Sequence, residues 1–399
     1  MNAFAAKILA VVTVLSMLCA SNRTYADKQS VGWSVIKTCG KELSVPPLKG
    51  HIWAIDQFND PIIAADSIAA YTSTDSSGTA IKATNPIGAS NFLVEGGSDN
   101  EFLYLSGSST NVNVVKQTGQ FVRFNVDESQ LTWYAIYPNS TDSGHYSVLA
   151  LDKMNNVFLL DVYISDHINM RTVIKLPIVI QEIAAGMGYI SISPDSKYVS
   201  YGNTTVDLTI FSVQDQKVVA DFKTPQDAEH SFIIWSAKPG VVAYAYAGGF
   251  SRDWKFFAIG NDGTTQELLD LKPLVDNGGF SQSGITPYEQ NNQIVIEMID
   301  EQLLSHIYIL DLSKDQIIDT CLSAYAPRIS WIDNDHIFVV AQAQAGDDGM
   351  TYSLIVSTQT SDYYKITYDP ILLPVGWVTD SSLSTPTPDG SPIPVQLGD

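Results

Sequence analysis

The chain has 399 residues, of which 45% are hydrophobic and only 16% are charged. This balance supports a large folded core and excludes a globally disordered chain. The formal net charge of −21 disfavours nucleic acid and anionic membrane surfaces as partners, because binding to phosphates needs clustered Lys and Arg side chains.

The first 26 residues have the order of a secretory signal peptide. A short segment with Lys7 precedes the apolar run Ile8–Ala20, and small residues ending at Ala26 suit cleavage. The run is shorter than the roughly 20 residues that a membrane-spanning helix needs. An alternative is lipoprotein processing at Cys19, but Leu18 stands where a small residue is expected. We therefore predict an exported protein, secreted or in the cell envelope, with no integral membrane segment after signal removal.

Short apolar runs rich in β-branched and aromatic residues follow along the whole chain, and windows with helical periodicity are scarce. In the first half the pattern is irregular, and residues 146–177 must hold extra strands or an insertion. In the second half strand–turn–strand units recur. Their turns lie at Asp195, Lys238, Asn291 and Asp333, which are 43, 53 and 42 residues apart.

A repeat near 45 residues is typical of a β-propeller with four-stranded blades, whereas a β-sandwich has no reason to repeat at that period. We predict an all-β fold: a single propeller over residues 27–378 with about seven blades, six or eight remaining open. The Ser/Thr/Pro-rich segment 379–399 cannot bury a core, and we expect it to be a disordered tail.

The stretch Ser193–Tyr201, with the sequence SPDSKYVSY, resembles the repeat of WD40-like and TolB-type propellers. Trp235-Ser236 with Pro239-Gly240 and the run Ile307–Ile318 look like further parts of that repeat. The resemblance is best over residues 186–368. It implies the propeller fold but little about function, because proteins with this blade range from periplasmic binding and scaffold proteins to the propeller caps of serine peptidases.

Removal of the signal leaves two cysteines, Cys39 and Cys321. In an oxidising compartment an even pair suggests a disulfide. A propeller brings its two chain ends together, and these cysteines lie near opposite ends of the chain. We therefore predict a disulfide between them, the alternative being two buried thiols.

No catalytic constellation stands out. The string nearest to a Gly-x-Ser-x-Gly nucleophile elbow, Gly279–Gly284, has the wrong spacing. Cysteine pairs with zinc spacing are missing, and the six histidines are scattered. Whether the chain is an enzyme stays open, with a non-enzymatic role favoured, and no cofactor is indicated except calcium as a possible ligand of loop carboxylates.

Four longer loops are expected on one face of the propeller, opposite the turn at Asp195: residues 138–145, 248–254, 299–302 and 345–349. As ligand-binding candidates they supply Phe250, Arg252, Trp254, Asp142 and His145, because aromatic rings beside a guanidinium suit capture of a glycan or peptide. Trp254 has the alternative of starting a strand in the core. Carboxylates that converge on this rim would suit Ca²⁺, and the candidates are Asp253, Asp300, Glu301, Asp347 and Asp348.

These observations favour a secreted, non-enzymatic propeller, expected to be monomeric, that binds a protein or a glycan through the loop-rich face or serves as a scaffold. The alternative is a calcium-assisted hydrolase or lyase that uses the rim carboxylates. A third hypothesis is a structural envelope module tethered by its tail.

Overall fold

The computed structural model describes part of the chain, and the account below concerns that part. The described residues are 33–48, 50–56, 67–72, 81–82, 92–93, 101–106, 111–116, 121–125, 131–138, 145–164, 168–179, 190–202, 207–223, 225, 230–236, 238–248, 254–285, 289–342, 351–367, 372–379 and 395–397. The predicted signal peptide and Cys19 lie outside them.

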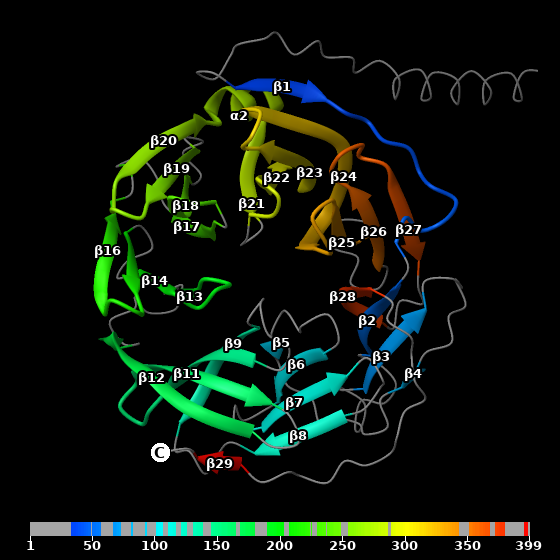
Figure 1. Ribbon diagram of the computed structural model, residues 1–399. Coiled ribbons are helices and arrows are strands. Elements are labelled where there is room, and N and C mark those ends of the chain that lie inside the picture. The colour runs from blue at the N-terminus through cyan, green and yellow to red at the C-terminus, as the bar shows by residue number, and fades with distance from the viewer. Residues whose placement is uncertain are drawn as a thin grey trace, which may run out of the picture.

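The described strands form six sheets that stand in a ring around a common centre (Figure 1). Four of these sheets have four strands each. Their strands, in spatial order, are β28 (Leu372–Thr379), β2 (Gly50–Asp56), β3 (Ser67–Thr72), β4 (Ile81–Lys82); β5 (Phe92–Leu93), β6 (Glu101–Ser106), β7 (Asn111–Lys116), β8 (Phe121–Asn125); β13 (Ser191–Ile192), β14 (Tyr198–Gly202), β15 (Leu208–Ser212), β16 (Lys217–Phe222); and β17 (His230–Trp235), β18 (Val241–Gly248), β19 (Lys255–Gly260), β20 (Thr265–Asp270).

The other two sheets are larger. A five-stranded sheet has the order β29 (Val395–Leu397), β12 (Ile168–Val179), β11 (Asn156–Ile164), β10 (His145–Leu151), β9 (Thr132–Pro138). An eight-stranded sheet runs through β21 (Phe280–Ile285), β22 (Gln293–Asp300), β23 (Leu304–Asp311), β24 (Gln316–Trp331), β25 (His336–Gln342), β26 (Thr351–Ser357) and β27 (Tyr363–Thr367), with β1 (Ser34–Lys37) paired to β24. Residues Val395–Leu397 lie in the predicted disordered tail, yet they pair in parallel with β12.

The ring is closed by the two ends of the chain. Strand β28, near the C-terminus, pairs antiparallel with β2, near the N-terminus, and completes one sheet together with β3 and β4 (Figure 1). This arrangement and the radial order of the sheets make the fold a β-propeller, as the repeat predicted.

The hydrophobic core lies between neighbouring sheets, so the central strands are apolar on both faces. In β18, Tyr244 and Tyr246 belong to the cluster shared with the β21–β23 side, and Ala243 and Ala245 belong to the cluster shared with β15 and β16. Outer strands such as β16 bury only some of their side chains. Packing on both faces explains why the central strands are apolar runs without polar alternation.

One described helix, α2 (Lys272–Gly278), links β20 to β21. It carries Pro273 in its first turn and ends at Gly279, which has a left-handed φ of 67°. Proline suits the start of a helix, and glycine suits this ending. No helix among the described residues is long and apolar enough to span a bilayer.

An N-terminal strap, defined as residues 33–48, runs over the outside of the eight-stranded sheet (Figure 1). Trp33 is buried in the core with α2 and β18, and β1 pairs in parallel with β24 over four residues. Farther along, Lys41 and Leu43 exchange backbone hydrogen bonds with Tyr363. Gly40 lies so close to the Ser361 backbone that a Cβ there would overlap it. The strap therefore contacts both β24 and β27 of this sheet.

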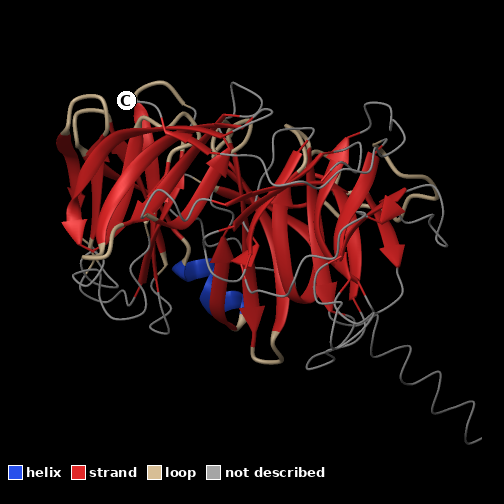
Figure 2. Ribbon diagram, turned by 90° about the horizontal axis from the view of Figure 1, so that it is seen from below, coloured by secondary structure: helices blue, strands red, loops and turns tan. Residues whose placement is uncertain are grey.

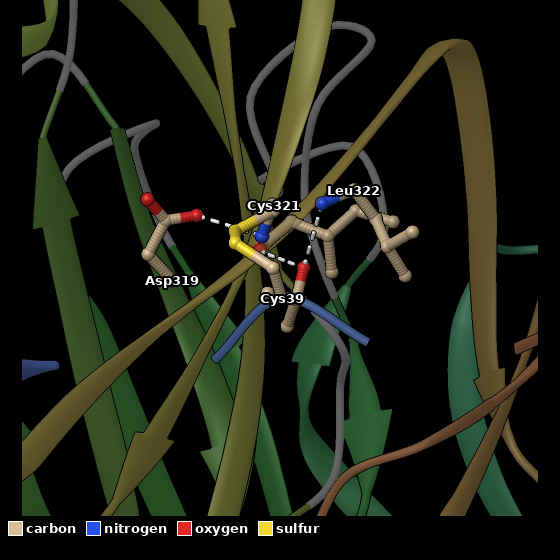
Figure 3. Close-up of a disulfide and its surroundings, with 6 residues drawn as sticks. Cys39, Asp319, Cys321 and Leu322 are labelled. Carbon is tan, nitrogen blue, oxygen red and sulfur yellow. Dashed lines mark hydrogen bonds between the residues drawn. A yellow bond between two sulfur atoms is a disulfide. The ribbon is translucent and has the colours of Figure 1, made fainter. Parts of the chain in front are cut away.

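The predicted disulfide is present: Cys39 of the strap is bonded to Cys321 of β24, with Cα atoms 5.1 Å apart (Figure 3). Cys321 has a φ of 60° and lies where the register between β23 and β24 shifts. Its amide donates to Asp319 Oδ1 at 2.8 Å, and the Leu322 amide donates to Thr320 at 3.2 Å. The bulge turns the sulfur outward, toward the strap.

Candidate functional site

The turns that join the first and second strands of each sheet lie on one side of the ring, which we call the first-turn face. Neighbouring sheets touch through these turns. Ser147 Oγ at the start of β10 lies 2.5 Å from Ser196 Oγ, and the Glu289 amide donates to the Trp235 carbonyl at 3.1 Å. Gln290 in turn donates to Asn334 at 2.5 Å. Trp235 Nε1 also donates to Ser191 Oγ at 2.7 Å, so that these contacts link five successive turns.

The turns between the second and third strands lie on the other side, which we call the second-turn face. Helix α2 belongs to this face, because the Leu271 amide at its start donates to the Trp254 carbonyl at 2.8 Å. The ring of Phe280, just after α2, lies 5.3 Å from the ring of His306 near the β22–β23 turn. In Figure 2 the helix marks this side of the molecule.

The described strands that flank the four predicted loops differ in their faces. Strands β18, β22 and β25 end at the second-turn face, whereas β10 begins with His145 at the first-turn face, where β9 ends. The prediction that all four share one rim is therefore wrong for His145, whereas Asp142 lies outside the described residues. The sequence pattern is irregular in this half of the chain, and it does not show that β9, just before His145, is the first strand of its sheet.

The remaining candidates divide into those that the structure describes and those that it does not. Phe250, Arg252, Asp142, Asp253, Asp347 and Asp348 lie outside the described residues. Trp254 is only 1% exposed and packs with Tyr246 and Phe256 in the core. A buried ring offers no face to a ligand, so Trp254 is a core residue and not part of a capture surface.

Asp300 organises the β22–β23 turn. Its Oδ1 accepts hydrogen bonds from the amides of Gln302 (2.9 Å) and Leu304 (3.0 Å), and its Oδ2 lies 3.1 Å from His306 Nε2. Burial opposes ionisation of this carboxyl, but the hydrogen bonds from His306 and the two amides outweigh it and lower its pKa. Both carboxylate oxygens of Asp300 therefore bind partners within the turn. The neighbouring Glu301 is exposed.

The Asp300 turn displays an apolar side chain. Leu303 is 61% exposed and has a φ of 63°, in the left-handed region that non-glycine residues seldom adopt. Its amide donates to the Asp300 carbonyl at 3.0 Å. The backbone holds Leu303 outward in a strained conformation, as is common where a residue serves a function.

The β10–β11 turn repeats this construction on the same face. Asp152 Oδ1 accepts from the amides of Met154 (2.8 Å) and Asn156 (2.9 Å), and Asn155 has a φ of 61°. Met154 is 72% exposed. Two turns of the second-turn face, in different sheets, therefore each use an aspartate to hold an exposed apolar side chain outward. The sequence shows both aspartates, but the exposure of Met154 and Leu303 depends on the turn geometry.

The predicted calcium site has no support among the described residues, where no group of three or more His, Cys, Asp or Glu side chains is placed to hold a metal ion. Asp195, on the first-turn face, accepts hydrogen bonds from Ser193 Oγ at 2.8 Å and from the Lys197 amide at 3.2 Å. These contacts are typical of residues that build turns.

Comparison with known proteins identifies no family, because no family model and no curated protein matches the chain. Solved structures that are similar to it are β-propeller proteins. The Swd1 β-propeller domain of Myceliophteria thermophila is 10% identical, with 84% of this chain and 98% of that one covered and a TM-score of 0.37. Apo AztD of Citrobacter koseri is 11% identical, with 83% and 97% covered and a TM-score of 0.38.

Prolyl oligopeptidase B of Galerina marginata is 11% identical, with a TM-score of 0.47 and 76% of this chain covered. The chain spans only about half the length of that enzyme, 48%. At this level of identity and structural similarity, none of the three carries an argument about function, and the fold assignment rests on the chain's own topology.

Proposed function

We propose that this chain is an exported, non-enzymatic propeller of seven blades that binds a protein partner through its second-turn face. The blade number follows if β24 serves two blades. Its residues 316–325 pair with β23 and its residues 325–331 pair with β25. On this interpretation the eight-stranded sheet is two blades, and β1 is an added outer strand.

The observation that carries the proposal is the exposed Leu303 in its aspartate-held turn. An apolar side chain displayed on a rigid turn loses little conformational entropy when a partner buries it, so more of the free energy of its burial contributes to affinity. Met154 repeats the construction. The disulfide and the N-terminal apolar segment support export, because disulfides persist in oxidising compartments.

The test compares Leu303→Asp and Met154→Asp with a control, Val218→Asp, which alters an exposed apolar residue (46%) on the outer strand β16. Each purified protein is immobilised and exposed to the extracellular and envelope fractions of its source, and the retained proteins are quantified by mass spectrometry. The most enriched partner is then purified and its Kd measured.

We expect a partner that the wild type and the control bind equally and that each turn variant binds about 10- to 100-fold more weakly. Melting temperatures of all four proteins must agree, since the substituted residues are exposed. A partner bound equally by every variant, or no protein retained above the bare matrix, would contradict the proposal.

A further inference from the structure

A patch of six polar and aromatic side chains covers part of one face of the β9–β12 sheet, near the first-turn face. The side chains form two rows across β10, β11 and β12, because residues paired directly across antiparallel strands point to the same side of a sheet. The first row is His145, Tyr163 and Asn169, and the second is Ser147, Asp161 and Arg171. We call these six residues the polar grid.

The inner part of the polar grid is held by specific contacts. Asp161 lies between two side chains: its Oδ1 contacts His145 Nε2, and its Oδ2 lies 3.3 Å from Arg171 Nη2. The His145 ring stacks on the Tyr163 ring, with centroids 4.1 Å apart and planes 6° from parallel. Ser147 reaches the next sheet through Ser196. These contacts hold the side chains of Tyr163 and Arg171 in place.

Exposure rises steadily across the grid. The side chains of His145 and Asp161 are 13% and 17% exposed, whereas Tyr163 is 43% exposed and the Arg171 side chain is 72% exposed. One further row along the strands, Leu149 and Leu159 are buried in the apolar core. The polar grid thus starts where the core ends and opens to solvent at Tyr163 and Arg171.

A purely structural role does not account for this arrangement. Polar groups between sheets cost free energy unless they are paired, and an apolar continuation of the Leu149 row would avoid that cost. A structural network also does not need an aromatic ring that is nearly half exposed beside a guanidinium. The guanidinium has five N–H donors, and its described contact with Asp161 engages a single nitrogen, Nη2.

We propose that the polar grid is a glycan-binding site. The apolar face of a pyranose ring packs well on an aromatic ring, and its hydroxyls accept charge-assisted hydrogen bonds from a guanidinium. Tyr163 supplies the ring and Arg171 supplies the donors. Asp161 and His145 are positioning residues: Asp161 orients the guanidinium, and His145 supports the buried side of the tyrosine ring.

This site is separate from the proposed protein-binding turns, because it lies at the opposite end of β10 from Met154. The two proposals can therefore fail independently. A second, different ligand on the opposite face would make the propeller an adaptor between a glycan and a protein.

The test measures binding of defined hexasaccharides by isothermal titration calorimetry. Neutral probes are laminari-, manno- and chito-hexaose, and acidic probes are hyaluronan and alginate hexamers. The variants are Tyr163→Ala, Tyr163→Phe and Arg171→Ala, with Val218→Asp on the outer strand β16 as the control. Thermal unfolding of each variant checks that it is folded.

We expect at least one probe to bind the wild type, Val218→Asp and Tyr163→Phe with similar Kd values. Tyr163→Ala and Arg171→Ala should each weaken that binding at least 10-fold. A larger loss for acidic than for neutral probes in Arg171→Ala would assign the guanidinium to a sugar carboxylate, and an equal loss would assign it to hydroxyls. Failure of the wild type to bind any probe, or binding by Tyr163→Ala and Arg171→Ala at wild-type strength, would overturn the proposal.

Discussion

At the scale of single residues, Glu297 carries a carboxyl group whose ionisation depends on where the fold places it. It lies in the middle of β22, directly opposite Ile307 of β23 and between the buried Ile296 and Met298. Burial raises its pKa from 4.5 to about 6, against a smaller opposing effect of a hydrogen bond from Ser305. Its charged form is therefore disfavoured in the folded protein.

This shift predicts that stability falls as pH rises from 4.5 to about 6. Over that range the folded state keeps the proton on Glu297, whereas the unfolded state has lost it. The loss should reach at most about 2 kcal/mol and level off at higher pH. Glu297→Gln removes the titrating group. The free energy of unfolding of this variant should therefore increase relative to that of the wild type as pH rises.

Urea denaturation of both proteins between pH 4.5 and pH 8 measures this difference. The exposed Glu301→Gln is the matched control, and its difference from the wild type should stay constant. A stability difference for Glu297→Gln that does not change with pH would show that the burial of Glu297 does not affect its ionisation.

The two cysteines and Trp254 differ in how much of their structural role can be predicted from sequence. The pairing of Cys39 with Cys321 was predictable, because two cysteines leave one pairing and a ring fold brings the chain ends together. The burial of Trp254 is not predictable from sequence, because a tryptophan at the start of a strand has the same local sequence whether its ring faces a loop or the neighbouring sheet.

At the scale of elements, the N-terminal strap is the part of the fold that sequence reasoning missed. Strand β1 has only four residues, three of them exposed, and it pairs in parallel with a strand almost 300 residues away. No local pattern signals such a pairing. Trp33, buried in a core built by α2 and β18, and the disulfide fasten the strap at its beginning and near its middle.

We expect that removing the disulfide by Cys39→Ala together with Cys321→Ala lowers the free energy of unfolding by about 2–5 kcal/mol. The bond joins residues 282 positions apart, and a link of that length restricts the unfolded chain strongly. Urea denaturation of the double variant measures the loss, with Val45→Ala, an exposed strap residue, as the control.

Reductant should lower the stability of the wild type to that of the double variant and leave the double variant unchanged. If the double variant and the untreated wild type unfold at the same urea concentration, the disulfide does not stabilise the folded protein.

At the scale of the whole molecule, closure of the ring depends on a single pairing of distant segments. Strand β28 pairs with β2 from Gly50 to Asp56, so the first and last parts of the propeller share one sheet. Without β28 that sheet would lose the strand that connects the two ends of the ring, and β2 would present an unpaired edge.

Two truncations separate this closure from the tail. A chain that ends at Ile371 lacks β28, and we expect it to lose the cooperative thermal transition and the near-ultraviolet circular dichroism of the wild type. A chain that ends at Asp380 keeps β28 and loses only β29 and its three residue pairs with β12, so it should unfold cooperatively with a melting temperature close to that of the wild type. Equal melting temperatures for the two truncations would contradict the role of β28.

The sequence by itself determined the all-β class, the propeller architecture and the cysteine pairing. These follow from local patterns, namely short apolar runs, turn residues and a period near 45 residues, and from the count of cysteines. Only the tertiary structure decided which loops share a face, because the face of a loop depends on its place in the strand order of its sheet. The same reason explains the polar grid: His145, Asp161 and Arg171 come from three strands, and only the pairing register brings them together.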